Sequence, residues 1–180
     1  MSDALIEARS GVARLARGFL GPICLGGLLV VASGPAVAQQ VTIAPGLITQ
    51  CLYDKPVERY PECIGIAAEQ CMKARGYATA VMGGCAHAEY EYWDQRLNVA
   101  YKAARAKAKR MDTANEELVR GSLVTALRDM QRAWIAYRDA TCDFERLQWG
   151  GGTGGGPATA SCLMRETAEQ FFDLDAFASY

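Results

Sequence analysis

The most informative chemical groups in this 180-residue chain are its cysteines, of which there are seven, beside a single histidine. The cysteines lack the C-x-x-C spacing of structural zinc sites, and one histidine gives little material for a histidine metal site or a Ser-His-Asp triad. The six that follow residue 38 form an even set, which is typical of three disulfides in an oxidising compartment. Paired cysteines are not nucleophiles. We therefore expect no metal ligand or cofactor, and disulfides among Cys51, Cys63, Cys71, Cys85, Cys142 and Cys162.

The other residues give no catalytic pattern. His87 lies beside Tyr90, Tyr92 and Trp93, and we interpret it as a surface histidine rather than a general base. No pair of acids is placed to face each other as glycosidic cleavage requires. The glycine tract 150–156 lacks the Lys-Ser/Thr of a phosphate-binding loop and follows a helical pattern, so it reads as a linker. A formal net charge of -1 does not favour a nucleic-acid partner. We expect no enzyme and no catalytic residue.

The N-terminus has the three parts of a secretory signal peptide. Arg9, Arg14 and Arg17 precede an apolar run over 19–32, and Ala36 and Ala38 supply a small-x-small cleavage site. The run falls short of the ~20 apolar residues that span a bilayer, which argues against an uncleaved anchor. We expect cleavage after Ala38, a periplasmic or secreted product, and no stable membrane insertion afterwards.

Hydrophobic periodicity predicts helices and no strands in the remaining chain. Residues 39–49 read as a loose lead-in, and a helix is best seen from Cys63 to Arg75, before Gly76. A long helix is expected from about Thr79 to Met111. A second long helix is expected over about 115–147, then a flexible loop over 150–157 and a last helix over about 161–177.

Two apolar stripes define the expected core. The short turn between the long helices places them antiparallel. The fold class is therefore all-α, a long antiparallel helical hairpin with flanking shorter helices and disulfides. The stripe of the first long helix is Cys85, Ala88, Tyr92, Leu97, Tyr101, Ala104, Ala108 and Met111, and that of the second is Leu123, Leu127, Met130, Trp134, Tyr137 and Thr141.

Polar residues of the two long helices are expected to meet in a seam. Folding the chain about residues 114–115 places Tyr101 opposite Arg128 and brings Asp94 near Arg138, which predicts an Asp94–Arg138 ion pair. Such a seam is either a structural clamp or an active site with shifted pKa values, and we favour the clamp. The expected members are Asp94, Asn98, Tyr101, Arg128, Gln131, Trp134 and Arg138.

The second long helix also carries a family resemblance. Residues 127–142 read L-R-x-x-Q-x-x-W-x-x-x-R-D-x-x-C, preceded by Cys85 and by D-x-x-L-N-x-x-Y over 94–101. This pattern resembles the LprI-like family of small exported bacterial proteins over roughly residues 79–175. The sequence differs from the family at Gln170, where a basic residue is usual, and in its long glycine tract. The resemblance implies a disulfide-linked helical domain in the periplasm or envelope, named after a lysozyme inhibitor.

Disulfide pairing and domain boundaries follow from these elements. Cys142–Cys162 ties the second long helix to the last one across the glycine tract. Cys71–Cys85 can tie the first helix to the next across Gly76, which leaves Cys51–Cys63 by subtraction, and other pairings of these four cysteines stay open. We divide the chain into a signal peptide over 1–38, a cysteine-containing helical extension over 39–78, and an LprI-like domain over 79–177.

The resemblance implies a lysozyme-type protein as the partner. An inhibitor of such a basic enzyme needs an acidic or hydrogen-bonding surface. Residues 139–180 hold seven acids and two bases, and between such a surface and a solvated helix face we favour the solvated face. The alternative function is a structural or stress-related envelope protein that contacts lipid or glycan through the basic row over 96–110. The candidate partner-binding residues are Asp139, Asp143, Glu145, Glu166 and Glu169.

Overall fold

The computed structural model describes residues 41–114 and 121–179, which belong to one compact unit. No strand occurs among them, so the predicted all-α class is confirmed. The expected signal peptide over 1–38 lies outside the described residues. The elements are α1 Pro45–Asp54, the 3-10 helix η1 Val57–Cys63, α2 Ile66–Arg75, α3 Thr79–Ala114, α4 Leu123–Leu147 and α5 Gly155–Ser179.

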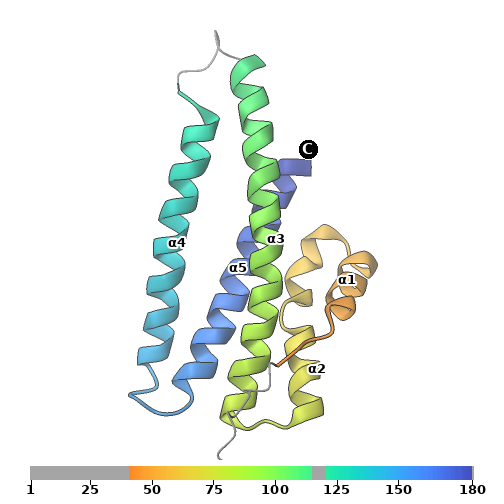
Figure 1. Ribbon diagram of the computed structural model, residues 1–180, viewed down its shortest axis with the longest axis vertical. Coiled ribbons are helices and arrows are strands. Elements are labelled where there is room, and N and C mark those ends of the chain that lie inside the picture. The colour runs from red at the N-terminus through yellow and green to blue at the C-terminus, as the bar shows by residue number, and fades with distance from the viewer. Residues whose placement is uncertain (1–40, 115–120, 180) are drawn as a thin grey trace, which may run out of the picture. The chain divides into compact units, whose positions relative to one another are not determined.

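Helix α3 is the central element of this unit. Helices α3 and α4 run antiparallel as predicted, and α5 returns in the direction of α3 (Figure 1). The most extensive contact is between α3 and α5, while α4 packs more on α5 than on α3. Helix α2 packs on α3, and α1 packs on α2 and η1. A third long helix, α5, therefore packs against the hairpin. Most of the packing surface of α3 that was predicted to contact α4 contacts α5 instead.

The N-terminal segment is more ordered than predicted. Helix α1 begins at Pro45, inside the expected loose lead-in over 39–49. Proline is well suited to the first turn of a helix because its φ is already fixed there, and Ile48 is fully buried one turn later. The Cys51–Cys63 disulfide then joins α1 to η1, with the two Cα atoms 5.7 Å apart. The fixed φ of Pro45 and the burial of Ile48 explain why these residues form a helix instead of the predicted loose segment.

The buried stripe of α3 differs from prediction. Cys85, Leu97, Ala104 and Ala108 are buried as expected, whereas Ala88, Tyr92, Tyr101 and Met111 are only half-buried. Because α2 and α5 both pack on α3, its buried sector is broader and rotated relative to that of a two-helix hairpin. The additional buried residues are Ala86, Glu89, Trp93 and Ala100.

Helix α4 starts later and buries less than predicted. It begins at Leu123, after the extended N-cap Ser122, whose hydroxyl accepts from the Thr125 N–H at 3.3 Å. The carboxylate of Asp112 also accepts from the Leu123 N–H at 2.7 Å, so the end of α3 holds the start of α4. Residues 115–120 of the expected helix lie outside the described residues. Within the predicted core stripe, Leu127 is buried, Leu123, Trp134 and Thr141 are half-buried, and Met130 and Tyr137 are exposed.

A tight glycine turn joins α4 to α5. Gly150 and Gly151 have positive φ, and a Cβ at Gly154 would collide with the Trp149 ring. The expected loop over 150–157 is shorter than predicted because α5 already begins at Gly155. Pro157 fits there, since the first turn of a helix needs no N–H bond from that position. The predicted Cys142–Cys162 disulfide spans this turn with its Cα atoms 5.4 Å apart.

The two remaining sequence-level pairings are also confirmed. Cys71 of α2 is bonded to Cys85 of α3, as predicted. Cys51 is bonded to Cys63, the pair that remained once the other four cysteines were assigned. Among residues 41–114 and 121–179, no helix combines the length and the apolar character needed to cross a bilayer.

Candidate functional site

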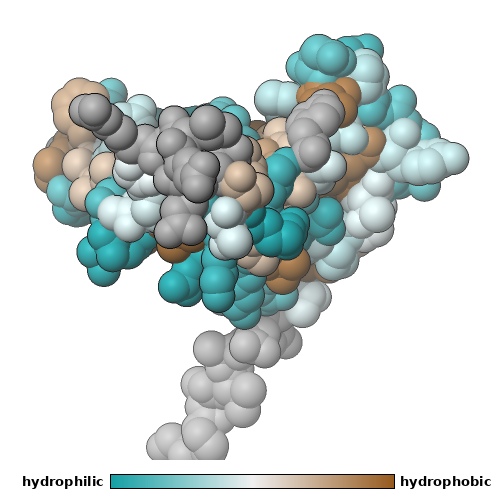
Figure 2. All heavy atoms as spheres, turned by 90° about the horizontal axis from the view of Figure 1, so that it is seen from above, coloured by the Kyte–Doolittle hydropathy of each residue, from teal (hydrophilic) through white to brown (hydrophobic). Residues whose placement is uncertain are grey.

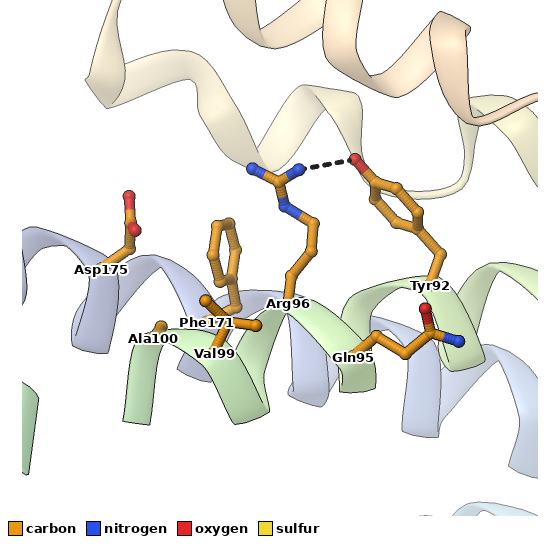
Figure 3. A pocket seen from close by; sticks show the side chains of 7 residues that line it. All are labelled: Tyr92, Gln95, Arg96, Val99, Ala100, Phe171 and Asp175. Carbon is orange, nitrogen blue, oxygen red and sulfur yellow. Dashed lines mark hydrogen bonds between the residues drawn. The ribbon is translucent and has the colours of Figure 1, made fainter. Parts of the chain in front are cut away.

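A pocket of about 400 Å³ opens between α3 and α5 and is the candidate small-molecule site. Five of its lining residues lie on α3 and two on α5 (Figure 3). Tyr92 and Arg96 are one turn apart, so the helical repeat places their side chains next to each other. The lining residues are Tyr92, Gln95, Arg96, Val99, Ala100, Phe171 and Asp175.

The Arg96 guanidinium is the main charged group of this pocket. Its Nη1 donates to the Tyr92 hydroxyl at 3.1 Å, and its Cζ lies 4.9 Å from the Phe171 ring centroid, a cation–π distance. Its Nε is buried and has no hydrogen-bond partner. Asp175 lines the same pocket, yet no ion pair of the described residues includes Arg96. The Arg96 guanidinium is thus held in place by Tyr92 and Phe171 and forms no ion pair with a carboxylate of the described residues.

Aromatic packing fixes the wall of the pocket. Trp93 is fully buried, and its ring lies 5.7 Å from that of Phe171 and 5.4 Å from that of Phe172. Tyr60 of η1 extends the cluster, with its ring 5.6 Å from Phe172. Because Phe171 contacts Trp93 as well as Arg96, the ring that supports the guanidinium has little freedom to move.

A buried carboxylate, Glu89, lies deeper on the same helix. Its Oε1 accepts from the Gly65 N–H at 2.6 Å and from Trp93 Nε1 at 3.0 Å, and its Oε2 accepts from the Ala68 N–H at 2.7 Å. Gly65 is the N-cap of α2, so Glu89 caps that helix from α3. A negative charge at a helix N-terminus is favoured by the helix dipole. The apolar pattern does not point to Glu89 because this residue is charged, although its spacing of four from both Cys85 and Trp93 places it among the buried residues of α3.

The predicted polar seam between α3 and α4 takes a different form. Arg138 bonds Asp139 of its own helix at 2.8 Å, and Asp94 accepts from Asn98 Nδ2 at 3.0 Å. The predicted Asp94–Arg138 ion pair is therefore wrong. Both charges act instead on Tyr90: burial raises the pKa of Tyr90, Asp94 raises this pKa further, and Arg138 lowers it.

Helix α5 also contributes to this region. Gln170 Nε2 donates to Gln131 Oε1 at 3.0 Å, so the predicted seam residue Gln131 bonds α5 rather than α3. Arg128 bonds the neighbouring Asp129, and this hydrogen bond together with the charge of Asp129 raises the pKa of Arg128. Trp134 stacks under Arg138, with the guanidinium carbon 4.9 Å from the ring centroid. The seam is thus shared by three helices, and its role as a clamp stays a prediction.

The candidate partner-binding acids are mostly paired. Asp139 bonds Arg138 and Asp143 bonds Arg146, both within α4. Arg165 of α5 bridges Glu145 of α4 at 2.7 Å and Glu166 at 3.3 Å. Glu169 is in none of the ion pairs of the described residues; burial raises its pKa, and the neighbouring charges of Glu166 and Asp173 raise it further.

An exposed apolar strip, which we call the outer α4 face, runs beside these acids. Met130, Tyr137, Phe144 and Leu147 are 42%, 60%, 65% and 60% exposed. They recur at steps of seven, seven and three, so they lie on one side of the helix. Seen from above, the surface shows hydrophobic residues interspersed with hydrophilic ones (Figure 2). Exposed hydrophobic groups gathered in this way mark interaction surfaces.

The remaining predicted groups have ordinary surroundings. His87 is exposed and lies 3.5 Å from Glu91, as expected for a surface histidine. Arg96 lines the pocket and does not lie on the solvent-exposed face of α3. The other basic residues of the row that are exposed are Lys102, Arg105, Lys109 and Arg110. No cluster of three metal-ligating side chains occurs in the described part of the chain.

Fold and surfaces together define the class: a small helical protein held by three disulfides, with an exposed apolar face suited to a partner. The family described as lysozyme inhibitor LprI matches residues 71–174, and the chain belongs to this family. The match begins at Cys71 and includes the four cysteines of two disulfides, whereas Cys51–Cys63 precedes it. Membership in an inhibitor family is consistent with a protein that is not an enzyme.

Two bacterial relatives extend the comparison. An uncharacterised 17.7 kDa protein in the puhA 5' region of Rhodobacter capsulatus is 27% identical over 157 residues, which cover 84% of this chain and 94% of the relative. The uncharacterised protein R02472 of Rhizobium meliloti (strain 1021) is 28% identical over 92 residues, 50% of this chain and 66% of the relative. No solved structure matches the chain.

Proposed function

We propose that this protein is exported and inhibits a lysozyme-type muramidase, which it contacts through the outer α4 face. The observation that carries the proposal is the exposure of Met130, Tyr137, Phe144 and Leu147 on one helix of a chain that belongs to the lysozyme inhibitor LprI family. Large side chains of this kind present ~150–250 Å² each when free, so four half-exposed ones give roughly 400 Å², the size of a functional patch.

Charge at the edge of this face supports a basic partner. Asp143 lies one turn before Leu147 on α4 and so borders this face, and the chain from residue 139 onward has a large excess of acids. A protein interface commonly joins an apolar centre to a polar rim, and complementary charge at the rim speeds association more than it adds affinity. The apolar residues are therefore expected to set affinity, and the acids to set the salt dependence.

A lysis assay tests this proposal. The oxidised protein is titrated into a lysozyme acting on bacterial cell walls, and the fall in turbidity is followed at low and raised salt. We expect inhibition at micromolar protein, reduced at least tenfold in potency by Tyr137→Ala combined with Phe144→Ala, because truncated central residues dominate such losses. The matched control is Tyr53→Ala, an exposed tyrosine on α1. Absence of inhibition across several lysozyme types, or equal potency of the double variant, contradicts the proposal.

Asp139→Asn with Asp143→Asn separates the role of charge. This variant is expected to associate more slowly than the unmodified protein at low salt and at the same rate at high salt, since exposed charges are screened within a Debye length of ~8–10 Å.

Export is tested by mass spectrometry of the natively expressed product, for which we expect an N-terminus at Gln39 and no free thiols among the six bonded cysteines.

The second candidate function is contact with anionic lipid or glycan. Lys102, Arg105, Lys109 and Arg110 are exposed on α3, and none of them takes part in an ion pair within the described residues. Basic residues near an anionic surface contribute ~1 kcal/mol each. Binding to anionic lipid vesicles but not to neutral ones, lost in Lys102→Gln with Arg105→Gln, is the expected result. Failure to bind anionic vesicles at low salt rejects this alternative for lipid.

A further inference from the structure

We propose that the pocket between α3 and α5 binds a small carboxylate with an apolar body and a hydrogen-bond donor at its far end. This site is distinct from the outer α4 face, because its lining comes only from α3 and α5. Its volume of about 400 Å³ is within the range of small-molecule sites, which join an apolar lining to a few placed polar groups.

The free edge of Arg96 selects the carboxylate. Tyr92 accepts from Nη1, which leaves Nε and Nη2 with no partner among the described residues. Because Nε is buried, a ligand oxygen cannot reach it, and Nη2 is the nitrogen of this edge that can donate to a carboxylate. A hydrogen bond between a guanidinium and a carboxylate is stronger than one between neutral groups.

The aromatic groups hold this edge in position. Cζ of Arg96 lies 4.9 Å from the Phe171 ring centroid and 5.5 Å from that of Tyr92. In Figure 3, Arg96 stands between Tyr92 and Phe171, and the dashed bond to Tyr92 leaves the opposite side of the guanidinium facing Phe171. A guanidinium fixed before binding loses less side-chain entropy when the ligand arrives.

Asp175 selects the rest of the ligand. Its carboxylate lines the same pocket on the far side of Phe171 from Arg96, and the two charges form no ion pair (Figure 3). A dianion such as a phosphate monoester would be repelled by Asp175, whereas an ammonium or hydroxyl group is attracted. Phe171, Val99 and Ala100 supply the apolar surface for the ligand body. The three features together define a carboxylate at one end and a donor at the other.

Three matched probes test the assignment by NMR titration of the oxidised, isotope-labelled protein. They are 3-(4-aminomethylphenyl)propionate, 3-phenylpropionate without the amine, and 3-phenylpropanamide without the charge. We expect the first to bind most tightly, the second several-fold more weakly and the amide at least tenfold more weakly than the second, with shifted resonances at Arg96, Val99 and Phe171. Equal affinity for carboxylate and amide, or shifts located elsewhere, overturns the proposal.

Variants assign the roles of the two charges. Arg96→Gln is expected to weaken both carboxylates at least tenfold, whereas the exposed control Arg105→Gln leaves their affinities unchanged. Asp175→Asn is expected to remove the preference for the aminomethyl probe and to leave 3-phenylpropionate as tight or tighter. Unchanged binding in Arg96→Gln, or an aminomethyl preference that survives Asp175→Asn, contradicts the site.

A further variant guards against loss of fold. If near-ultraviolet circular dichroism shows that Arg96→Gln is unfolded, Arg96→Lys keeps the charge and removes the guanidinium that Tyr92 and Phe171 hold in position. We then expect Arg96→Lys to weaken both carboxylates several-fold while the amide is unaffected. Carboxylate affinities equal to those of the unmodified protein in a folded Arg96→Lys variant reject the contact between the guanidinium and the carboxylate.

Discussion

Helices α4 and α5 have the same length and contribute very differently to the core. Each has 25 residues, yet α5 buries nine of them and α4 only Leu127 and Cys142. Helix α5 lies along α3 and contacts α4 as well, whereas α4 has one main neighbour. The fold is therefore built on α3 and α5 with α2 beside them, and α4 is an added helix whose far side stays in contact with solvent. A helix that contributes little to the core is free to present apolar groups to a partner.

The largest expected difference between these regions comes from aromatic truncation. Trp93→Ala removes a fully buried ring at the α3–α5 contact and is expected to lower the free energy of unfolding by about 3–5 kcal/mol. Tyr137→Ala on the outer α4 face is expected to change it by no more than about 0.5 kcal/mol. Chemical denaturation of both variants measures the contrast. Similar losses would show that α4 belongs to the core after all.

The Cys142–Cys162 disulfide is the next test, because it links α4 to α5 covalently. Replacing both cysteines by alanine opens a loop with a sequence separation of 20 residues, and chain entropy predicts a loss of about 3 kcal/mol. Hydrogen exchange should show lower protection in α4 while α3 and α5 keep theirs. Uniform loss of protection in all three helices would contradict the independence of α4.

Glu89→Gln probes the opposite, deeply buried region. The glutamine amide keeps one acceptor oxygen but loses the charge that faces the N-terminus of α2. Its NH2 group is a donor, so it cannot accept the hydrogen bond from the Gly65 or the Ala68 backbone N–H. We expect a loss of about 1–3 kcal/mol, as for a buried hydrogen bond to a charged group. The control Glu91→Gln changes an exposed carboxylate on the same helix. A negligible effect at position 89 would mean that the cap contributes nothing to stability.

The smallest effect is expected at Glu169, on the exposed side of α5. Burial raises the pKa of this carboxyl, and the charges of Glu166 and Asp173 add to the increase. A carboxyl with a raised pKa holds its proton more tightly in the folded state, so ionisation with rising pH destabilises the fold. Glu169→Gln should therefore raise the melting temperature slightly at pH 7. The difference should vanish below the unfolded value near pH 4.5, and a gain that persists at pH 3 argues against this cause.

Periodicity gave the helices correctly where the apolar pattern was long. The Arg75-Gly76 end of α2 and the Thr79 start of α3 agree with the structure. Cysteine position predicted the Cys142–Cys162 pairing, because it joins two helices that follow one another in the chain, whereas the structure settled the other two pairings, which the sequence left open. Helix α1 was missed because it is short and has one fully buried residue, Ile48, which is too few to produce a pattern.

The candidate sites were harder to predict for a different reason. The α4 stripe of Met130, Trp134 and Tyr137 identifies an amphipathic helix, but it does not say which side of the strip meets the core. The Asp94–Arg138 pair was inferred from a two-helix register, and it fails because α5 takes the larger share of contact with both helices. Arg96 reads as one more base in a charged row until Phe171, from a distant part of the chain, is placed against it.

The amino-acid sequence alone determined the all-α class, the antiparallel course of α3 and α4, and the Cys142–Cys162 pairing, because each depends on spacing between residues near in sequence. Tertiary structure decided that Glu89 caps α2, that Arg96 meets Phe171, and that the outer α4 face is exposed. These features join residues from different helices, and their geometry depends on how α5 packs against α3. Local patterns limit the faces a helix can bury, and only the packing of all the helices selects among them.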